Sequence, residues 1–259
     1  MFDKPIFDAH LHIIDHRFPM QPNQGFLPSD FSVADYRQQA APLNIDGGAV
    51  VSGSFQGFDQ GYLLEALKQL GPGYVGVTQI PASTSDEEII ALHEAGVRAV
   101  RFNVQRGGSE SVKHLEQLGL RVYELVKWHV ELYVDSRQLP GLSTTLHKLP
   151  AVVIDHLGLS KAGFKYLLPL VEKGARIKAT GFSRCDFDVL TAMRQITAIN
   201  AGALLFGTDM PSTRAPRPFA ATDLQLILQN FPEKIAAKIC RENALALYRP
   251  RILSDSGLR

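Results

Sequence analysis

The sequence contains little cysteine and no long hydrophobic run. Two of its 259 residues are cysteines, Cys185 and Cys240, which stand far apart and form no CxxC pair, so we expect two reduced thiols and no disulfide framework. Apolar stretches such as residues 151–154 and 203–206 are far shorter than the roughly 20 residues of a membrane-spanning helix. The first residues show neither the basic region nor the apolar segment of a signal peptide. We therefore expect a cytoplasmic protein without a membrane partner.

The chain also lacks an excess of charge of either sign. It has 27 Lys and Arg against 26 Asp and Glu, a formal net charge of +1, so it has no extended field to attract a polyanion, and nucleic acid is not expected as a partner. Hydrophobic residues make up 45% and charged residues 20% of the chain, which excludes a disordered or fibrous protein. No Pro/Ser-rich linker divides the sequence, and no exposed heptad predicts an oligomeric state. We predict one domain over residues 1–250 and a C-terminal tail over residues 251–259.

Short β-branched runs alternate with longer segments of helical periodicity along the whole chain, as in βα units. Eight such units in about 250 residues are typical of a (β/α)8 TIM barrel, whereas an open doubly wound sheet more often has six strands or fewer. We therefore predict an α/β fold, a single-domain TIM barrel. The predicted strands are residues 6–13, 48–52, 74–80, 99–104, 130–135, 151–155, 176–179 and 203–207, and the predicted helices are residues 59–70, 86–94, 110–127, 161–173, 187–200, 222–230 and 233–247.

Three predicted strands end in histidine or aspartate. His10 and His12 lie two residues apart on the first strand, so both rings point to one side of it. His156 directly follows the sixth strand, and Asp209 follows the eighth in a Gly-Thr-Asp-Met-Pro segment. Taken singly, each of these residues also has a purely structural explanation; His156, for example, could cap a loop. Because barrel active sites lie at the carboxyl ends of the strands, their convergence predicts a catalytic or metal site there.

Cationic side chains gather at the same predicted end of the barrel. Arg101 lies inside an apolar strand, where it is costly to bury unless it pairs with an anion, either a substrate carboxylate or an internal partner such as Asp135. A guanidinium binds a carboxylate through two parallel hydrogen bonds, so these residues predict a small anionic substrate. The others are Arg106, Arg137, Lys178, Arg184, Arg214 and Arg217.

Polar groups on two further strand ends complete the candidate site. Tyr133 on the fifth strand presents its hydroxyl to the barrel interior or packs in the core. Ser54 and Gln56 lie in a Gly-rich loop after the second strand and are able to hydrogen-bond a ligand, although such residues are common in loops.

These motifs resemble a known family. Asp-Ala-His-Leu-His at residues 8–12, Ile-Asp-His-Leu-Gly at 154–158 and Gly-Thr-Asp-Met-Pro at 207–211 are similar to motifs of the amidohydrolase superfamily, in its amidohydrolase-related (amidohydrolase family 2) branch. Within that branch the chain most resembles the 2-pyrone-4,6-dicarboxylate hydrolases and related lactonases. The likeness covers nearly the whole chain and implies a TIM-type barrel.

The resemblance also implies roles for particular residues. Asp209 would orient or deprotonate the attacking water, and His10, His12 and His156 would surround the lactone carbonyl. Arg101, Tyr133 and Arg184 match positions that hold substrate carboxylates, whereas Arg106 lies one residue out of step with another such arginine. This sequence departs from the dicarboxylate hydrolases at Leu159, where they have arginine, and at Ser212, where they have histidine. These departures leave the exact substrate open.

Our leading hypothesis is therefore a hydrolase that opens a small carboxylate-bearing lactone of the 2-pyrone-4,6-dicarboxylate type in aromatic compound catabolism, with Asp209 activating water. His10, His12, His156 and Asp209 serve either a metal-free site or one divalent ion, zinc or manganese. The fourth-strand lysine of two-metal amidohydrolases is absent, since Arg101 occupies that strand. The alternatives are a metal-dependent nonoxidative decarboxylase of an aromatic or muconate-like acid, and a non-catalytic barrel that binds an organic acid.

Overall fold

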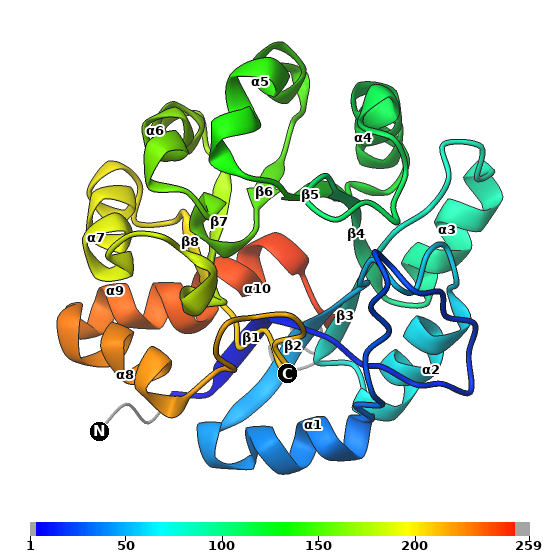
Figure 1. Ribbon diagram of the computed structural model, residues 1–259, viewed down its shortest axis with the longest axis horizontal. Coiled ribbons are helices and arrows are strands. Elements are labelled where there is room, and N and C mark those ends of the chain that lie inside the picture. The colour runs from blue at the N-terminus through cyan, green and yellow to red at the C-terminus, as the bar shows by residue number, and fades with distance from the viewer. Residues whose placement is uncertain (1–3, 252–259) are drawn as a thin grey trace, which may run out of the picture.

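The computed structural model describes residues 4–251, and these form a ring of eight parallel strands surrounded by helices (Figure 1). The strands pair in sequence order, each with the next. This confirms the predicted TIM barrel. Most of the predicted tail lies outside the described residues. The strands are β1 (Ile6–Leu11), β2 (Ile45–Val51), β3 (Tyr74–Thr78), β4 (Val97–Asn103), β5 (His129–Tyr133), β6 (Val152–Ile154), β7 (Arg176–Ala179) and β8 (Leu204–Phe206).

Backbone hydrogen bonds join β1 to the segment that follows β8 and so close the ring. The Asp209 amide donates to the His10 carbonyl at 2.7 Å, and the His12 amide donates to the Met210 carbonyl at 2.8 Å. Gly207 makes this approach possible, because a Cβ at this position would lie 2.7 Å from both the backbone nitrogen and the Cβ of His10. The closing seam therefore also brings the first and the last of the three sequence motifs together.

The helices follow their strands as the periodicity predicts. Ser85 caps α3 through a capping box with Glu88, and Gly96 follows the end of that helix with φ of 110°, so that its bounds match the prediction. Helices α1 and α5 have no counterpart among the helix ranges predicted from the sequence. The helices are α1 (Val33–Ala40), α2 (Gly61–Leu70), α3 (Asp86–Glu94), α4 (Leu115–Val126), α5 (Leu139–Lys148), α6 (Phe164–Glu172), α7 (Val189–Ile199), α8 (Ala221–Asn230), α9 (Glu233–Ala237) and α10 (Asn243–Tyr248).

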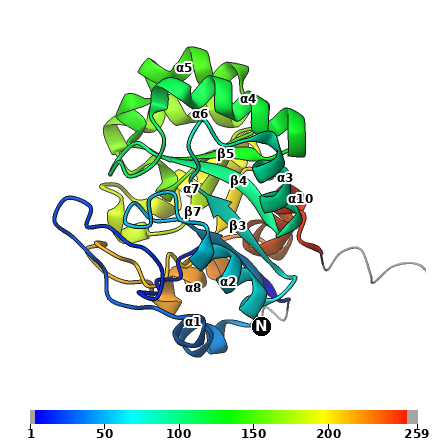
Figure 2. The same ribbon diagram turned by 90° about the vertical axis from the view of Figure 1, so that its right-hand side faces the viewer.

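The core has two layers. The outer layer lies between the strands and the surrounding helices, and Trp128 and Tyr36 are among its fully buried side chains. The inner layer fills the barrel and consists of side chains from the strands together with Ala244 and Tyr248 of α10. Figure 2 shows α10 on one side of the barrel and the long loop after β1, in dark blue, on the other. The loop side is the carboxyl end of the strands, where the site was predicted.

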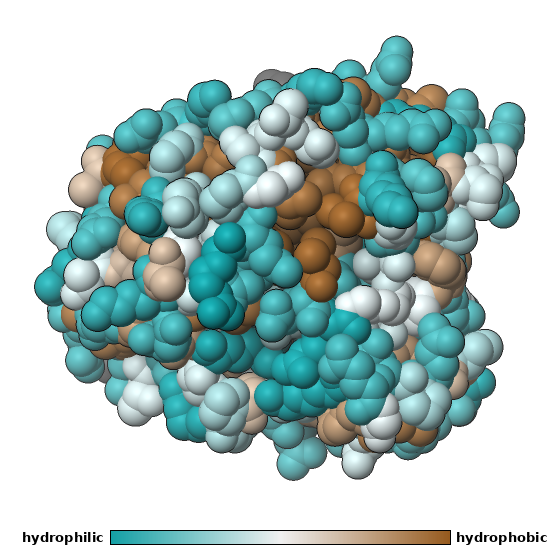
Figure 3. All heavy atoms as spheres, turned by 45° about the horizontal axis from the view of Figure 1, so that its top comes forward, coloured by the Kyte–Doolittle hydropathy of each residue, from teal (hydrophilic) through white to brown (hydrophobic). Residues whose placement is uncertain are grey.

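The surface is mostly hydrophilic, and hydrophobic side chains gather in a hollow near the middle of the view in Figure 3. Both cysteines are free thiols, as predicted; Cys185 is half-buried and Cys240 is buried. Among the described helices, none combines the length and the apolar character that crossing a bilayer requires.

Candidate active site

The predicted histidines and aspartate converge at the carboxyl end of the barrel. Asp209 Oδ1 lies 3.5 Å from His12 Nε2 and 3.7 Å from His10 Nε2. The ring of His156 lies 5.0 Å from that of His10, centroid to centroid. All four residues are buried, so their charges and hydrogen bonds act in a low-dielectric space.

Two of these residues hold a left-handed backbone conformation. His156 has φ of 51° and Asp209 has φ of 60°, a region that is sparsely populated by residues other than glycine and costs on the order of 1 kcal/mol. In both cases the strand has just ended, and the sharp turn of the chain directs the side chain into the barrel mouth rather than along the wall. The strain therefore supports a functional placement of both residues.

The hydrogen bond of His12 fixes which nitrogen carries its proton. His12 Nδ1 lies 2.7 Å from the Val51 carbonyl oxygen, and a carbonyl only accepts hydrogen bonds. Nδ1 must therefore be the protonated nitrogen, and in the neutral ring Nε2 presents a lone pair toward Asp209. Two hydrogen-bond acceptors thus face each other across the site.

Arg184 binds the remaining oxygen of Asp209. Its Nε and Nη2 atoms donate to Asp209 Oδ2 at 2.9 and 2.8 Å, and Nη2 also donates to the Thr213 carbonyl. Burial alone would raise the pKa of Asp209, but Arg184 and the neighbouring histidines hold it well below its usual range. Asp209 is therefore ionised and turns only Oδ1 toward the histidines.

Arg101 is fixed from both sides in the barrel interior. Its Nη2 donates to Asp155 Oδ2 at 2.7 Å and its Nη1 to the Ser52 carbonyl at 2.7 Å. The internal partner considered from the sequence, Asp135, was wrong, because Asp135 pairs with the neighbouring Arg137 instead. The pairing spans the barrel interior past β5, because Arg101 on β4 and Asp155 after β6 both point inward.

A small cavity opens above these groups. Its volume is about 40 Å³, which is below the 300–1,000 Å³ typical of ligand pockets, so a ring-shaped ligand can enter only if side chains or loops move. Gln56 is not among its lining residues, because its amide bonds to the Gly53 amide and the Ile13 carbonyl of the surrounding loops. The predicted substrate-contacting residues that line the cavity are Ser54, Arg101, Arg106, Tyr133 and Arg184.

The long loop after β1 lies against two arginines at the cavity mouth. Asn23 donates from Nδ2 to the Arg106 carbonyl and accepts from Arg214 Nη1 at 3.1 Å. The Arg214 guanidinium lies 4.4 Å from the centroid of the Phe26 ring, a cation–π contact. Because Arg106 and Arg214 also line the cavity, this loop and the site are mechanically linked.

Known proteins resemble this chain over most of its length. The sequence model of the amidohydrolase family (Amidohydro_2) matches residues 7–249. This chain belongs to the amidohydrolase family. The 2-pyrone-4,6-dicarboxylate hydrolase of Comamonas testosteroni is 35% identical over 58% of this chain and 51% of its own length, so the match spans about half of that relative. D-galactarolactone isomerase of Agrobacterium fabrum is 25% identical over 96% of this chain and 92% of its own length.

Solved structures share the barrel. A protein of Agrobacterium tumefaciens in its apo form has a TM-score of 0.85 with 24% identity and covers 96% of this amidohydrolase and 97% of the other chain. A probable 2-pyrone-4,6-dicarboxylic acid hydrolase of Acinetobacter baumannii with citric acid bound has a TM-score of 0.82 with 22% identity, covering 95% and 100%. The family and the fold predicted from the motifs are thereby confirmed.

The amidohydrolase site has the donors for one divalent ion. His10, His12 and Asp209 each offer an atom within 4.8 Å of the others, and His10, Asp155 and His156 form a second such group. Within residues 4–251, His10 Nε2 and Asp209 Oδ1 are buried without a hydrogen-bond partner. Two imidazoles and a carboxylate suit zinc or manganese, so the residues fit a metal in kind and number.

Sequence analysis missed several buried polar residues of the site. Asp8, the first residue of the Asp-Ala-His-Leu-His motif, accepts hydrogen bonds from Thr208 and Tyr36 and so ties β1 to the β8 end. Lys178 had been placed with the cations of the mouth, but it lies fully buried below the histidines beside Glu131. A lysine and a glutamate inside two apolar strands were the available signal, since such residues stay buried only when they are paired.

Burial also keeps His10 and His156 of the amidohydrolase neutral. It lowers the pKa of His10 to about 4, with Lys178 adding to the effect. Burial likewise lowers the pKa of His156 well below its usual range. Neutral rings can donate or accept hydrogen bonds at neutral pH, as attack of water on a carbonyl requires.

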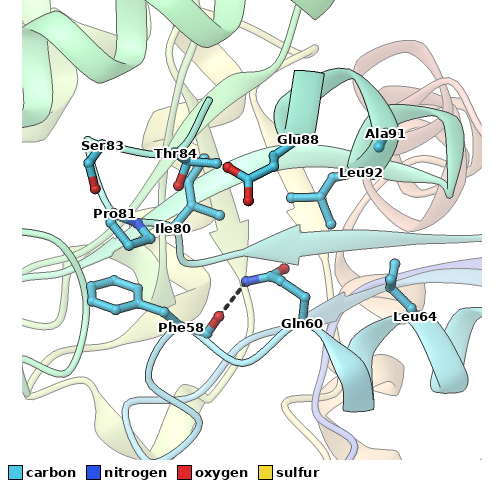
Figure 4. A pocket seen from close by; sticks show the side chains of 10 residues that line it. All are labelled: Phe58, Gln60, Leu64, Ile80, Pro81, Ser83, Thr84, Glu88, Ala91 and Leu92. Carbon is cyan, nitrogen blue, oxygen red and sulfur yellow. Dashed lines mark hydrogen bonds between the residues drawn. The ribbon is translucent and has the colours of Figure 1, made fainter. Parts of the chain in front are cut away.

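A larger groove of about 510 Å³ lies between α2 and α3, away from the histidines, and Figure 4 shows its lining. Phe58, Pro81 and Leu92 give it an apolar character, and Glu88 is the partner of Ser85 in the capping box of α3. It brings together no catalytic group comparable to those at the barrel mouth, and we place the active site at the mouth.

Proposed function

We propose that this amidohydrolase hydrolyses a small lactone that carries carboxylate groups. The observation that carries the proposal is the ionised Asp209 carboxylate, whose free Oδ1 faces His10 and His12 at a cavity lined with arginines. A pocket that only bound an organic acid would gain nothing from a buried carboxylate. The relatives named as a dicarboxylate hydrolase and a lactone isomerase support a lactone as the substrate class.

The geometry suits activation of a water molecule. A water between Asp209 Oδ1 and His12 Nε2 would donate a hydrogen bond to each, because both atoms are acceptors. Its oxygen would bond to the lactone carbonyl carbon while its proton passes to Asp209. The ring C–O bond then breaks, the ring oxygen takes that proton, and the product is the open hydroxy acid or its keto form.

Arginines would hold the substrate carboxylates. Arg106 bears no carboxylate partner among the described residues, so its guanidinium is available to an anion, and Arg101 and Tyr133 line the same cavity. Arg184 would have to divide its hydrogen bonds between Asp209 and the substrate. Such contacts position the carbonyl against the water and lower the entropic part of the barrier.

If the protein binds a divalent ion, His10, His12 and Asp209 would hold it, with His156 close by. The ion would supply Lewis-acid polarisation of the carbonyl oxygen. The residue roles given above for binding and proton transfer are those of the protein groups themselves.

The test is hydrolysis of 2-pyrone-4,6-dicarboxylate, followed by the loss of its ultraviolet band with and without chelator. We expect turnover by the wild-type protein, and we expect Asp209→Asn to lower kcat by about 10²–10⁴-fold with a smaller change in KM. The matched control is Asp186→Asn, an exposed aspartate outside the cavity, which should keep wild-type rates. Near-wild-type turnover of the Asp209 variant would refute the assignment, and release of carbon dioxide would favour the decarboxylase.

Lactone isomerisation is a second candidate, because the isomerase from Agrobacterium matches nearly the whole chain. In that reaction a hydroxyl of the substrate would replace water as the nucleophile. Reaction in ¹⁸O-labelled water separates the two candidates: hydrolysis places one solvent oxygen in the product, and isomerisation places none.

A further inference from the structure

A cluster of buried charges lies directly behind the catalytic histidines, and the proposed function gives it no role. It consists of Glu131, Asp155 and Lys178, the interior cluster, and all three side chains are fully buried. Lys178 Nζ lies 2.5 Å from Glu131 Oε2, 3.2 Å from His10 Nδ1 and 3.7 Å from Asp155 Oδ1. The lysine therefore reaches the catalytic His10 from the side opposite Asp209.

Lys178 and Glu131 form a hydrogen-bonded ion pair inside the barrel. Glu131 Oε1 accepts a hydrogen bond from the Tyr248 hydroxyl at 2.5 Å and lies 3.0 Å from His129 Nε2, while Oε2 faces the ammonium. A carboxylate with both oxygens so occupied is stabilised as an anion, and the ammonium beside it as a cation. A charged lysine has three donors and no lone pair, so toward any neighbour it can only donate.

We infer that Lys178 is a positioning residue that fixes the proton of His10 on Nε2, the nitrogen facing the catalytic space. The ammonium donates to Nδ1, which must then carry the lone pair, and the neutral ring keeps its only N–H on Nε2. That N–H points toward Asp209 Oδ1, 3.7 Å away, across the space where water and the lactone carbonyl would meet.

Asp155 is the group that competes for His10 Nδ1. Its Oδ1 lies 3.5 Å from Nδ1 and would favour a proton there. However, that contact is longer than the one to Lys178, and Asp155 is already bound through Oδ2 to Arg101 at 2.7 Å. The shorter contact, with a donor that has no lone pair, decides the tautomer.

The histidines of the site therefore differ in which ring nitrogen carries the proton. His12 offers a lone pair because its Nδ1–H donates to the Val51 carbonyl. His156 Nδ1 lies 3.3 Å from the Thr180 carbonyl, which only accepts hydrogen bonds, so in the neutral ring its Nε2 also carries the lone pair. His10 alone offers an N–H, so it is the ring able to stabilise negative charge on the carbonyl oxygen. A metal ion would need the lone pair of His10 Nε2, and Lys178 therefore biases the site against metal.

Nuclear magnetic resonance of the full chain with ¹⁵N-labelled histidine tests the tautomer directly, and His10→Gln identifies the His10 signals. We expect the wild-type protein to show His10 protonated on Nε2, and Lys178→Met to show it protonated on Nδ1, donating to Asp155. A wild-type His10 protonated on Nδ1, or a tautomer unchanged in Lys178→Met, would overturn the inference.

Two further variants separate positioning from charge and folding. Lys178→Met leaves the buried Glu131 carboxylate without its cation, which destabilises the fold. The double variant Lys178→Met/Glu131→Gln avoids this cost because it removes both charges together. We expect the double variant also to show the Nδ1 tautomer and to bind zinc at least about tenfold more tightly than the metal-stripped wild-type protein, a difference of about 1.4 kcal/mol. Lys148→Met, an exposed lysine paired with Glu116, should match the wild type. Equal zinc affinity in the double variant and the wild type would contradict the inference.

The catalytic part of the inference rests on the proposed function, whereas the tautomer does not. If wild-type protein opens the lactone, the double variant should lose about a hundredfold in kcat with KM within about twofold, as for the loss of one oxyanion donor. Unchanged kcat would overturn the positioning role. Failure of the wild-type protein to turn over any lactone would refute the proposed function alone, since resonance and zinc binding would still decide the tautomer.

Discussion

At the scale of single residues, the partner of each charged group matters as much as its position. Asp209 stands where the motif predicts, yet half of its carboxylate is occupied by Arg184. The same arginine is a predicted contact of the substrate. Under the proposed function, binding of an anionic substrate and release of the Asp209 carboxylate would therefore be coupled through one guanidinium.

This coupling predicts the pH dependence of an Arg184 variant. Arg184 helps to hold the pKa of Asp209 below its usual range, so Arg184→Gln should raise that pKa. A base must be unprotonated to act, and a raised pKa therefore moves the acid limb of the kcat/KM profile to higher pH. The measurement is the pH–rate profile of both proteins, with Arg194→Gln on the surface of α7 as the control. Coincident acid limbs would show that Arg184 does not act on the base.

The sequence predicted residue positions better than residue partners. Histidines at i and i+2 of a strand must share a face, so the pairing of His10 with His12 followed from spacing alone. Arg101 could not be matched to Asp155 in this way, because their contact depends on how β4 and β6 are placed around the ring. Lys178 was misplaced for the same reason.

At the scale of secondary structure elements, the seam between β1 and β8 determines how the two ends of the candidate site approach each other. Gly207 lets the two chains approach, and the residues on either side of the seam include His10 and Asp209. Any side chain at position 207 would push β1 away and carry the catalytic groups with it.

We therefore expect Gly207→Ala to lower the free energy of unfolding by about 1–3 kcal/mol and to reduce kcat, because the added methyl group overpacks the seam. Gly141→Ala is the matched control, since a Cβ there meets nothing within 4 Å and α5 is a helix. It should be neutral or stabilising by up to about 1 kcal/mol. Urea unfolding of both variants measures the difference, and equal stability would refute the role of the seam.

Elements were predicted well where local signals mark their ends. α3 has a serine cap and a terminating glycine, and its bounds were correct. α1 was missed although Ser32 and Asp35 form a capping box, because the polar loop before it and the short helix give little periodicity. Strand order needed no further signal, since sequential βα units close into only one ring.

At the scale of the whole molecule, the barrel buries several titratable groups in its interior. Burial lowers the pKa of His10 to about 4 and lowers those of His129 and His156 as well. Asp8 opposes them, because burial raises its pKa to about 6. These histidines and Asp8 therefore have opposite effects on how stability changes between about pH 4 and 6.5.

These pKa shifts predict that the free energy of unfolding decreases at acidic pH. A histidine whose pKa is depressed by folding takes up a proton on unfolding, so its contribution to stability is present above about pH 6.5 and is lost as pH falls toward 4. His10 alone accounts for on the order of 3 kcal/mol, and Asp8 cancels a similar amount, which leaves His129 and His156. Urea unfolding monitored by fluorescence of the buried Trp128 should show decreasing stability from pH 7 to 4.5. A constant free energy over this range would contradict the prediction.

The position of Tyr248 has a consequence for the order in which the protein assembles during synthesis. Its hydroxyl binds Glu131 from α10, a helix that follows all eight strands in the chain. A ribosome therefore releases every strand before the residue that covers the base of the interior charges. Until α10 packs against the barrel, Glu131 and Lys178 are open to solvent at the end of the interior that Tyr248 covers. All eight strands have therefore been synthesised before the residue that closes this end.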